Sequence, residues 1–329
     1  MSRNTHVGIG GDVSVPDIPP VPEGTARPLW SVMIPTYNCS AYLPETLRSV
    51  LAQDPGLDKM QIEVVDDCST ADDPERVVRD IGNGRVGFYR KTANAGATAN
   101  FNTCIERSVG QFVHILHGDD IVMDGYYSEV SSLAHKFPEA GLYATRSFFV
   151  DEKLDIEGVT RRICELEVFG ESAMPFYYAT PLQFAGVTVR RAAYEALGGF
   201  DSRYNHIADC EMWARIVRAM GGVVSPKVLS AYRIFRGNDS SRLERTGDNV
   251  REICLLNRTF SQRYPDFSQV TGQRRAADLA WRQVRKFHEQ GDSEAEEANL
   301  RLWAELTPIA RRLAVRLMTA APALRRYVG

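Results

Sequence analysis

Apolar and polar positions along this chain predict strands that alternate with helices. Short apolar runs at residues 31–35 and 62–65 are each followed by a polar turn and then by a segment suited to a helix. Across residues 43–51, apolar side chains recur at i, i+4, i+7 and i+8, which gives one buried helix face. Strands and helices in this order predict an α/β fold, in which a mostly parallel sheet carries helices on both faces.

The same alternation continues to about residue 235 and then changes. Further strands are predicted at residues 85–90, 111–116, 141–150, 186–189 and 230–235. Further helices are predicted from residue 74, at 97–107, from 126, at 191–197 and around 209–220. Residues 151–168 show little periodicity and residues 236–241 read as a polar loop, whereas the chain is predicted to be helical from residue 248 to its end.

Two of the predicted strands end in paired acids. Asp66 and Asp67 follow the strand at 62–65. Asp119 and Asp120 follow another strand, after a glycine that breaks the apolar run. Carboxyl ends of parallel strands share one edge of an open sheet, where ligands bind, and crowded carboxylates there favour a divalent cation and the phosphate it holds. The alternative is a turn in which the acid only caps the next helix.

A further acid, Asp209, falls in the first turn of a predicted helix. A carboxylate at a helix N-terminus commonly caps the helix or interacts with its dipole. The functional alternative is a general base that the helix end keeps ionised at neutral pH. The residues alone leave both interpretations open.

Composition excludes several classes of protein. The chain has 329 residues, 44% of them hydrophobic and 25% charged, with a formal net charge of -3, which argues against a general nucleic-acid binder. Its six cysteines are scattered without metal-binding spacing, which indicates a reducing compartment. We find no apolar run long enough for a membrane span and no signal-peptide core, so a cytoplasmic protein is expected. Residues 1–27 are predicted to be a flexible leader.

Two later segments carry concentrated aromatic or basic side chains. Residues 173–184 contain two prolines and four aromatic residues, so we predict a loop that lines or covers a cleft, with local core packing as the alternative. After residue 307, apolar residues alternate with arginines. Such a helix lies on an anionic inner membrane surface, packs on its own domain, or contacts a second subunit.

Seven short motifs occur in order between residues 30 and 241. They are IPTYN at 34–38, VVDDCST at 64–70, NAGATANFN at 94–102, HGDD at 117–120, GGFD at 198–201, DCEMWAR at 209–215 and YRIFRGNDS at 232–240. Together they resemble the inverting glycosyltransferases of family 2, which have the GT-A architecture. The resemblance implies a GT-A domain at 28–245, with a nucleotide-binding half at about 28–125, an acceptor half at about 126–245, and a helical region at 246–329.

The resemblance implies a site for a nucleotide-diphospho-sugar, with UDP as the expected nucleotide. Asp67, with Asp66 beside it, would hydrogen-bond the uracil edge. Asp119 would bind Mg²⁺ or Mn²⁺, with Asp120 or His117 as further ligands. The full set implied for the donor is Pro35, Thr36, Tyr37, Asn38, Asp66, Asp67, Asn94, Gly96, Asn102, His117, Gly118, Asp119, Asp120 and Arg236.

The resemblance also implies the reaction. Asp209 matches the catalytic base, which would activate a hydroxyl of a glycan or lipid-linked acceptor for a single displacement with inversion. The expected setting is the synthesis of surface polysaccharide or glycoconjugate. Aromatic faces suit sugar rings, so Tyr177, Tyr178 and Trp213 are predicted on the acceptor side.

Two positions depart from the family's pattern. His117 stands where an acid of the Asp-x-Asp motif is expected, and Phe235 stands where many members carry a histidine. Arg236 is predicted to supply positive charge in place of that histidine. A degenerate member that binds nucleotide-sugar or a partner without catalysis is therefore one alternative. A nucleotidyltransferase is another, although residues 34–38 lack its glycine-rich phosphate loop.

Overall fold

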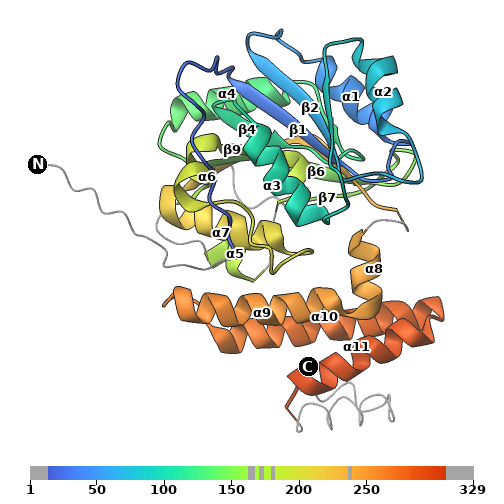
Figure 1. The fold of residues 1–329 in the computed structure, drawn as a ribbon. Helices are drawn as coiled ribbons and strands as arrows, with labels where there is room; N and C mark the ends of the chain where they lie inside the picture. The colour runs from blue at the N-terminus through green and yellow to red at the C-terminus, as the bar shows by residue number, and fades with distance from the viewer. Residues whose placement is uncertain (1–13, 162–166, 170–173, 179–181, 236–238, 309–329) are drawn as a thin grey trace, which may run out of the picture. The chain divides into compact units, whose positions relative to one another are not determined.

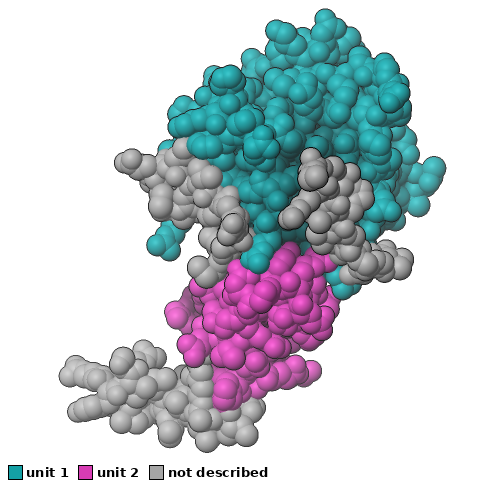
Figure 2. Space-filling model, turned by 90° about the vertical axis from the view of Figure 1, so that its left-hand side faces the viewer, with its two compact units in different colours: residues 1–176, 180–234 teal, residues 177–179, 235–329 magenta. Residues whose placement is uncertain are grey.

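The protein forms two compact units. Its computed structural model describes residues 14–161, 167–169, 174–178, 182–235 and 239–308. Unit 1 contains the described residues up to Phe176 together with residues 182–234, and unit 2 contains Tyr177, Tyr178 and the described residues from Phe235 onward (Figure 2). The domain boundary expected after residue 245 stays a prediction.

Unit 1 is built on one sheet with the strand order β3-β2-β1-β4-β9-β6-β10-β5. The strands on this path are β1 (Trp30–Thr36), β2 (Met60–Asp66), β3 (Gly87–Arg90), β4 (Phe112–Ile115), β5 (Ile121–Val122), β6 (Leu142–Val150), β9 (Val187–Arg190) and β10 (Gly222–Arg233). The neighbours β3, β2, β1 and β4 are all parallel, so their carboxyl ends share one edge. β9 runs antiparallel between β4 and β6, which makes the second half of the sheet mixed.

Helices cover both faces of this sheet, which confirms the predicted α/β class. They are α1 (Leu43–Leu51), α2 (Pro74–Gly82), α3 (Ala97–Arg107), α4 (Tyr126–Lys136), α6 (Arg191–Leu197) and α7 (Ala208–Met220). Figure 1 shows α3, α6 and α7 on one face and α1, α2 and α4 on the other. Alternate residues of β1 explain this, because Trp30, Val32 and Ile34 all enter the core that packs against α1 and α4.

Unit 2 is helical, as predicted. Its helices are α8 (Asp239–Thr246), α9 (Asp248–Arg263), α10 (Gln269–Gln290) and α11 (Ser293–Leu306). Their core joins alanines on α10 to Val250, Leu302 and Trp303, and the rings of Trp281 and Trp303 lie 4.6 Å apart. Among the described residues, no helix is both long and apolar enough to cross a membrane. The predicted basic helix beyond residue 308 lies outside the described part of the chain.

The chain before β1 differs from the expected flexible leader. The carbonyl of Pro16 accepts a hydrogen bond from the Gly199 amide at 2.8 Å, and the carbonyl of Ser14 accepts one from Ser202 at 2.9 Å. The side chain of Ile18 is only 3% exposed. Residues 14–18 are therefore fixed by backbone hydrogen bonds to a loop that lies far along the sequence. Residues 1–13 lie outside the described residues.

Several elements were missed or shortened in the sequence prediction. The segment 151–168 holds β7 (Ile156–Val159), which pairs with β6, and the start of β8 (Glu167–Phe169), which pairs with β10. β10 begins at residue 222, eight residues before the predicted start at 230. The prediction missed this first part of the strand because Pro226 interrupts the apolar pattern, at a point where the register also shifts. The predicted loop at 173–184 includes a short helix, α5 (Met174–Tyr177), and α8 begins inside the predicted loop at 236–241.

The start of β4 requires a glycine. A Cβ atom on Gly110 would lie 2.5 Å from the carbonyl carbon of Trp30 and 2.6 Å from the amide nitrogen of Ser31, both in the backbone of β1. We predict that Gly110→Ala lowers the free energy of unfolding by roughly 3 kcal/mol, because neither strand can move aside. Urea unfolding followed by circular dichroism measures this. Gly158→Ala on β7 is the matched control, since its nearest neighbour is a Phe149 side-chain atom at 3.4 Å. Equal losses in the two variants would contradict the prediction.

Candidate active site

Most of the predicted donor-site residues lie on the loops that follow β1, β2 and β4, and these three neighbouring parallel strands end at one edge of the sheet (Figure 1). The parallel register pairs Thr36 with Asp66. The Asp67 amide continues this ladder by donating to the Thr36 carbonyl at 2.9 Å, and the Gly118 amide donates to the Pro35 carbonyl at 3.1 Å. The structure therefore brings the loops after these three strands into one connected edge.

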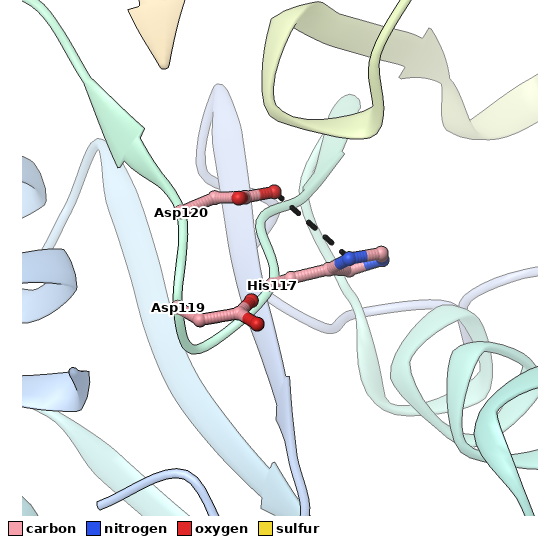
Figure 3. Close-up of side chains that lie close together, drawn as sticks. All are labelled: His117, Asp119 and Asp120. Atoms are coloured by element: carbon pink, nitrogen blue, oxygen red, sulfur yellow. Dashed lines mark ion pairs between the residues drawn. The ribbon is translucent and has the colours of Figure 1, made fainter. Parts of the chain in front are cut away.

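Three potential ligands lie together on the loop after β4 (Figure 3). His117, Asp119 and Asp120 each offer one atom within 4.8 Å of the others. Asp120 is fully buried, and its Oδ1 accepts a hydrogen bond from the Arg233 amide at 3.0 Å. Its Oδ2 lies 3.9 Å from Nδ1 of His117. Among the described residues, neither this Oδ2 nor Nε2 of His117 has a hydrogen-bond partner.

The electrostatics of this loop suit a cation. Burial raises the pKa of Asp119 to about 6, although the nearby Arg233 lowers it. Burial and the charge of Asp119 raise the pKa of Asp120 well above its ordinary value. Burial also lowers the pKa of His117 to about 4, so its imidazole is neutral at pH 7. A neutral imidazole and two carboxylates, with two buried atoms lacking partners, form a donor set that fits a divalent metal ion.

Arg233, at the end of β10, fixes this loop. Its side chain is 1% exposed and donates to the carbonyl of Asp119 at 2.9 Å, to the carbonyl of Glu152 at 2.7 Å and to the carboxylate of Glu45 at 2.5 Å. Arg233 was not predicted from the sequence as a site residue, although it lies within the last of the seven motifs. Arg236, which was predicted to contact the diphosphate, lies outside the described residues.

Aromatic rings hold His117 in place. Its imidazole stacks on Phe101, with ring centroids 5.1 Å apart and planes 9° apart, and contacts Phe184 on a centroid distance of 4.6 Å. Phe184 in turn packs against Trp213 at 5.2 Å. Trp213 is completely buried, so the structure gives it a core position in place of the predicted acceptor-facing one.

Asp67 organises the loop before α3. Its carboxylate accepts hydrogen bonds from the amides of Ala95, at 3.1 Å, and Gly96, at 2.8 Å. Nζ of Lys91 lies 2.7 Å from the same carboxylate. Asp67 is 2% exposed, and most of its hydrogen-bonding capacity is used within the chain. Its predicted contact with a nucleobase stays a prediction.

Asp66 has a comparable set of internal partners. It is completely buried and accepts hydrogen bonds from the amide and the hydroxyl of Ser69. It also forms an ion pair with Arg90 at 2.6 Å. These contacts fix the turn that follows β2, so the structure supports a positioning role for this acid.

Two asparagines predicted to bind the donor also hold loops together. Oδ1 of Asn38 accepts hydrogen bonds from the amides of Thr70 and Ala71, each at 2.9 Å. Asn102 donates to the carbonyl of Phe200 at 2.9 Å and accepts from its amide at 2.7 Å. Both ends of the Asn102 amide are therefore used, which gives it a structural role in place of the predicted donor contact.

Other predicted donor residues remain accessible or require a small side chain. Tyr37 is 46% exposed, and Asn94 is exposed as well. At Gly118, a Cβ atom would lie 2.9 Å from Sγ of Cys39 and 3.3 Å from Oγ1 of Thr36. A larger residue at Gly118 would therefore displace the end of β1 from the loop after β4.

Asp209 opens α7, as the sequence predicted. Its Oδ1 accepts a hydrogen bond from the Cys210 amide at 2.7 Å, and the residue is half-buried. The other acid of this turn, Glu211, is completely buried and pairs with Arg215 at 2.8 Å. Arg215 also donates to the carbonyls of residues 197–199. Glu211 thus belongs to a structural ion pair, which leaves Asp209 as the candidate base on this helix.

The two predicted acceptor-side tyrosines belong to unit 2. Tyr177 is 1% exposed, donates to Asp266 at 3.1 Å and stacks on Tyr264 at a centroid distance of 5.1 Å. Tyr178 stacks on Phe267 at the same distance. Tyr177 is therefore part of an aromatic core, which is the alternative that the sequence had left open. For Tyr178, which is half-buried, acceptor binding stays a prediction.

Comparison with known proteins decides the family. The model of Glycosyl transferase family 2 matches residues 31–198, which is half of the chain and includes the loops after β1, β2 and β4. The chain belongs to glycosyl transferase family 2. The resemblance inferred from the seven motifs is thereby confirmed.

Relatives of this family 2 member include proteins from several bacteria. The uncharacterized protein MT1568 of Mycobacterium tuberculosis is 27% identical over 244 residues, which cover 68% of this chain and 73% of that protein. The minor teichoic acid biosynthesis protein GgaB of Bacillus subtilis is 24% identical over 155 residues. That match covers 46% of this chain but only 17% of GgaB, so the likeness is confined to a small part of the larger protein.

Two solved structures share the fold. TarS of S. aureus, in complex with UDP-GlcNAc, superposes with a TM-score of 0.56 at 18% identity, covering 79% of this chain and 72% of TarS. The mannosyltransferase PcManGT from Pyrobaculum calidifontis, in complex with GDP-Man and Mn²⁺, gives a TM-score of 0.55 at 21% identity, covering 94% of this chain and 84% of PcManGT. The predicted GT-A fold is confirmed.

The buried contacts of Arg233 generate a prediction for this family 2 protein. Lysine keeps the charge at this position but cannot make three separate hydrogen bonds from a planar group, so the loop after β4 should lose its fixed shape. We predict that Arg233→Lys weakens Mn²⁺ binding about tenfold or more, as loss of an outer partner at a metal site commonly does. Electron paramagnetic resonance of free Mn²⁺ measures the affinity.

Arg191→Lys serves as the control for this experiment. Arg191 is also buried and donates to the carbonyls of Ser108 and Pro19, away from the loop after β4. Both variants are expected to lower the melting temperature, but only Arg233→Lys should change Mn²⁺ affinity. An equal change in both, or in neither, would show that Arg233 has no specific role at this loop.

Proposed function

We propose that this chain transfers a sugar from a nucleotide-diphospho-sugar, with UDP as the nucleotide, to a hydroxyl of a glycan or lipid-linked acceptor, with inversion at the anomeric carbon. The observation that carries the proposal is the cluster of His117, Asp119 and Asp120 at the sheet edge where β1, β2 and β4 end. In open α/β sheets, ligands bind outside this edge.

The structural relatives support the donor class. TarS has been solved with UDP-GlcNAc and PcManGT with GDP-Man and Mn²⁺, so proteins of this fold hold nucleotide-sugars. GgaB takes part in minor teichoic acid biosynthesis, which supports a surface polysaccharide as the product. An assay should include both UDP-sugars and GDP-sugars, because TarS was solved with a UDP-linked sugar and PcManGT with a GDP-linked one.

The loop after β4 would hold Mg²⁺ or Mn²⁺ through Asp119, with Asp120 and His117 as further ligands. When bound, the ion supplies positive charge that stabilises the departing nucleoside diphosphate. The chain supplies the rest of the donor site: Tyr37 and Asn94 are exposed to solvent at this edge. The amide of Gly96, held by Asp67, shapes the loop that would border the ribose and diphosphate.

Asp209 would act as the general base. Its position in the first turn of α7 favours the ionised carboxylate, because the N-terminus of a helix carries partial positive charge. Asp209 would take the proton of the acceptor hydroxyl as its oxygen attacks the anomeric carbon from the face opposite the diphosphate. One displacement needs one base, and the configuration inverts. A retaining double displacement would need a second carboxylate as nucleophile.

The acceptor would be a growing surface polysaccharide or a lipid-linked oligosaccharide. In keeping with this donor class and the expected reducing compartment, we propose that the reaction takes place in the cytoplasm, at the inner membrane face where the acceptor is lipid-linked. We also propose that the basic segment after residue 307 contacts that membrane or a second copy of the chain.

The role of Asp209 is tested by a nucleotide-release assay. Purified protein is incubated with a panel of UDP- and GDP-sugars, with candidate acceptors, and with Mg²⁺ or Mn²⁺. We predict that Asp209→Asn lowers kcat about 100-fold or more and leaves the donor Kd unchanged, because amide oxygen is a poor proton acceptor.

Asp248→Asn is the matched control, because Asp248 opens α9 as Asp209 opens α7. This variant should retain wild-type kcat. Release that survives Asp209→Asn would remove the base assignment. Donor binding without release by the wild-type protein, for every donor and acceptor, would favour a non-catalytic nucleotide-sugar-binding protein, for which the replacement of an acid by His117 is the supporting observation.

A further inference from the structure

We propose that residues 14–19, which we call the N-terminal strap, position the base on α7. The strap holds the loop at residues 198–202, and this loop is hydrogen-bonded to α7, whose first turn carries Asp209. Because Asp209 is the proposed base, this role rests on the proposed function. The family 2 model begins at residue 31, so the strap lies outside the part of the chain that it matches.

Backbone hydrogen bonds join the strap to the loop at two points. The carbonyl of Ser14 accepts from the Ser202 amide at 2.9 Å. The carbonyl of Pro16 accepts from the Gly199 amide at 2.8 Å. The strap precedes β1 and forms no strand of the sheet, so its order comes from these contacts and from its packing.

The far end of the strap is anchored separately. The guanidinium of Arg191, on α6, is buried, and both of its terminal nitrogens donate to the carbonyl of Pro19 at 3.3 Å. Between the two anchors, the side chain of Ile18 is only 3% exposed. A buried isoleucine stabilises this arrangement by removing its apolar surface from water.

The strap packs against the loop without space between them. A Cβ atom on Gly198 would lie 2.7 Å from Cγ1 of Val15 and 2.9 Å from the carbonyl oxygen of Pro16. A Cβ atom on Gly199 would lie 3.0 Å from Cγ of Pro16. The two glycines therefore allow the strap to approach the loop closely, and loss of the strap would leave one side of the loop unsupported.

Gly199 connects the strap to α7. Its amide donates to Pro16 of the strap, and its carbonyl accepts a hydrogen bond from Arg215 of α7 at 2.8 Å. Arg215 is 3% exposed and pairs with the completely buried Glu211 at 2.8 Å. Glu211 and Asp209 both lie in the first turn of α7. A shift of the loop would therefore disturb a buried ion pair next to the proposed base.

The position of a base strongly affects its rate. A general base must lie within hydrogen-bond reach of the proton that it takes. A displacement of about 1 Å can lower the rate of a reaction about 100-fold. The strap should therefore affect kcat through α7, although none of its residues is assigned to the donor site.

Ile18→Asp in the full-length protein tests this role. A carboxylate at this buried position must reach water, which should release the strap without removing a strand of unit 1. We expect faster hydrogen–deuterium exchange of the amides at 198–202 and at 209–212. We also expect kcat for nucleotide release to fall about tenfold or more, with an unchanged donor Kd, because the base moves and the donor site does not.

Two further substitutions serve as controls. Pro20→Asp adds the same carboxylate two residues away at an exposed position, and it should keep wild-type exchange and kcat. Ile18→Val keeps an apolar side chain at the buried position and should also keep wild-type kcat. Ile18→Ala creates no buried charge, so it replaces Ile18→Asp if that variant fails to fold, with the same expected pattern.

A double variant tests whether the strap acts through the base. Ile18→Asp combined with Asp209→Asn should have the kcat of Asp209→Asn alone, because a base that has been removed cannot be misplaced. A further loss of kcat in the double variant would overturn the inference.

The exchange and rate measurements separate this inference from the proposed function. Wild-type kcat in Ile18→Asp, or unchanged exchange at either 198–202 or 209–212, would overturn the inference and leave the transferase proposal standing. If the wild-type protein releases no nucleotide from any donor, the proposed function fails. The exchange at 209–212 then decides alone whether the strap holds α7.

Discussion

The buried guanidinium of Arg233 is the constraint on which the site depends. It is a positive charge enclosed by protein, and its partners come from the loop after β4, from Glu45 on α1 and from the carbonyl of Glu152 after β6. An enclosed charge is tolerated only when such partners are in place. The shape of the acidic loop is therefore set by a residue more than 100 positions later in the chain.

Much of the fold could be predicted because local patterns determine it. β1, β2 and β4 are short apolar runs that end in polar turns, and parallel pairing then places the acids of the last two at one edge. Irregular elements were harder to predict. Only the last four residues of β10 were predicted, because Pro226 and the polar Lys227 interrupt its apolar run where the register shifts. Pairing with β6 on both sides of Pro226 keeps this segment a strand although its local pattern does not predict one.

For the polar residues of the motifs, the sequence could not reveal whether their partners are a ligand or other parts of the chain. Their identity suggested ligand contacts, but Asp66 and Asp67 use most of their hydrogen bonds within the chain. Asn102 finds its partner in Phe200, 98 residues later. A sequence shows that such a side chain must be satisfied, and only the fold shows whether a ligand or a distant backbone does so. For His117, the sequence showed that a histidine replaces the expected acid, but only the fold showed that its ring stacks on Phe101.

The loop at 197–200 connects two helices of unit 1. Asn102 of α3, Arg215 of α7 and the backbone of Pro16 all form hydrogen bonds with it. A shift of α7 relative to α3 would therefore have to break hydrogen bonds to this loop. If Asp209 is the base, a substitution that loosens the loop would change the position of this carboxylate without touching any substrate.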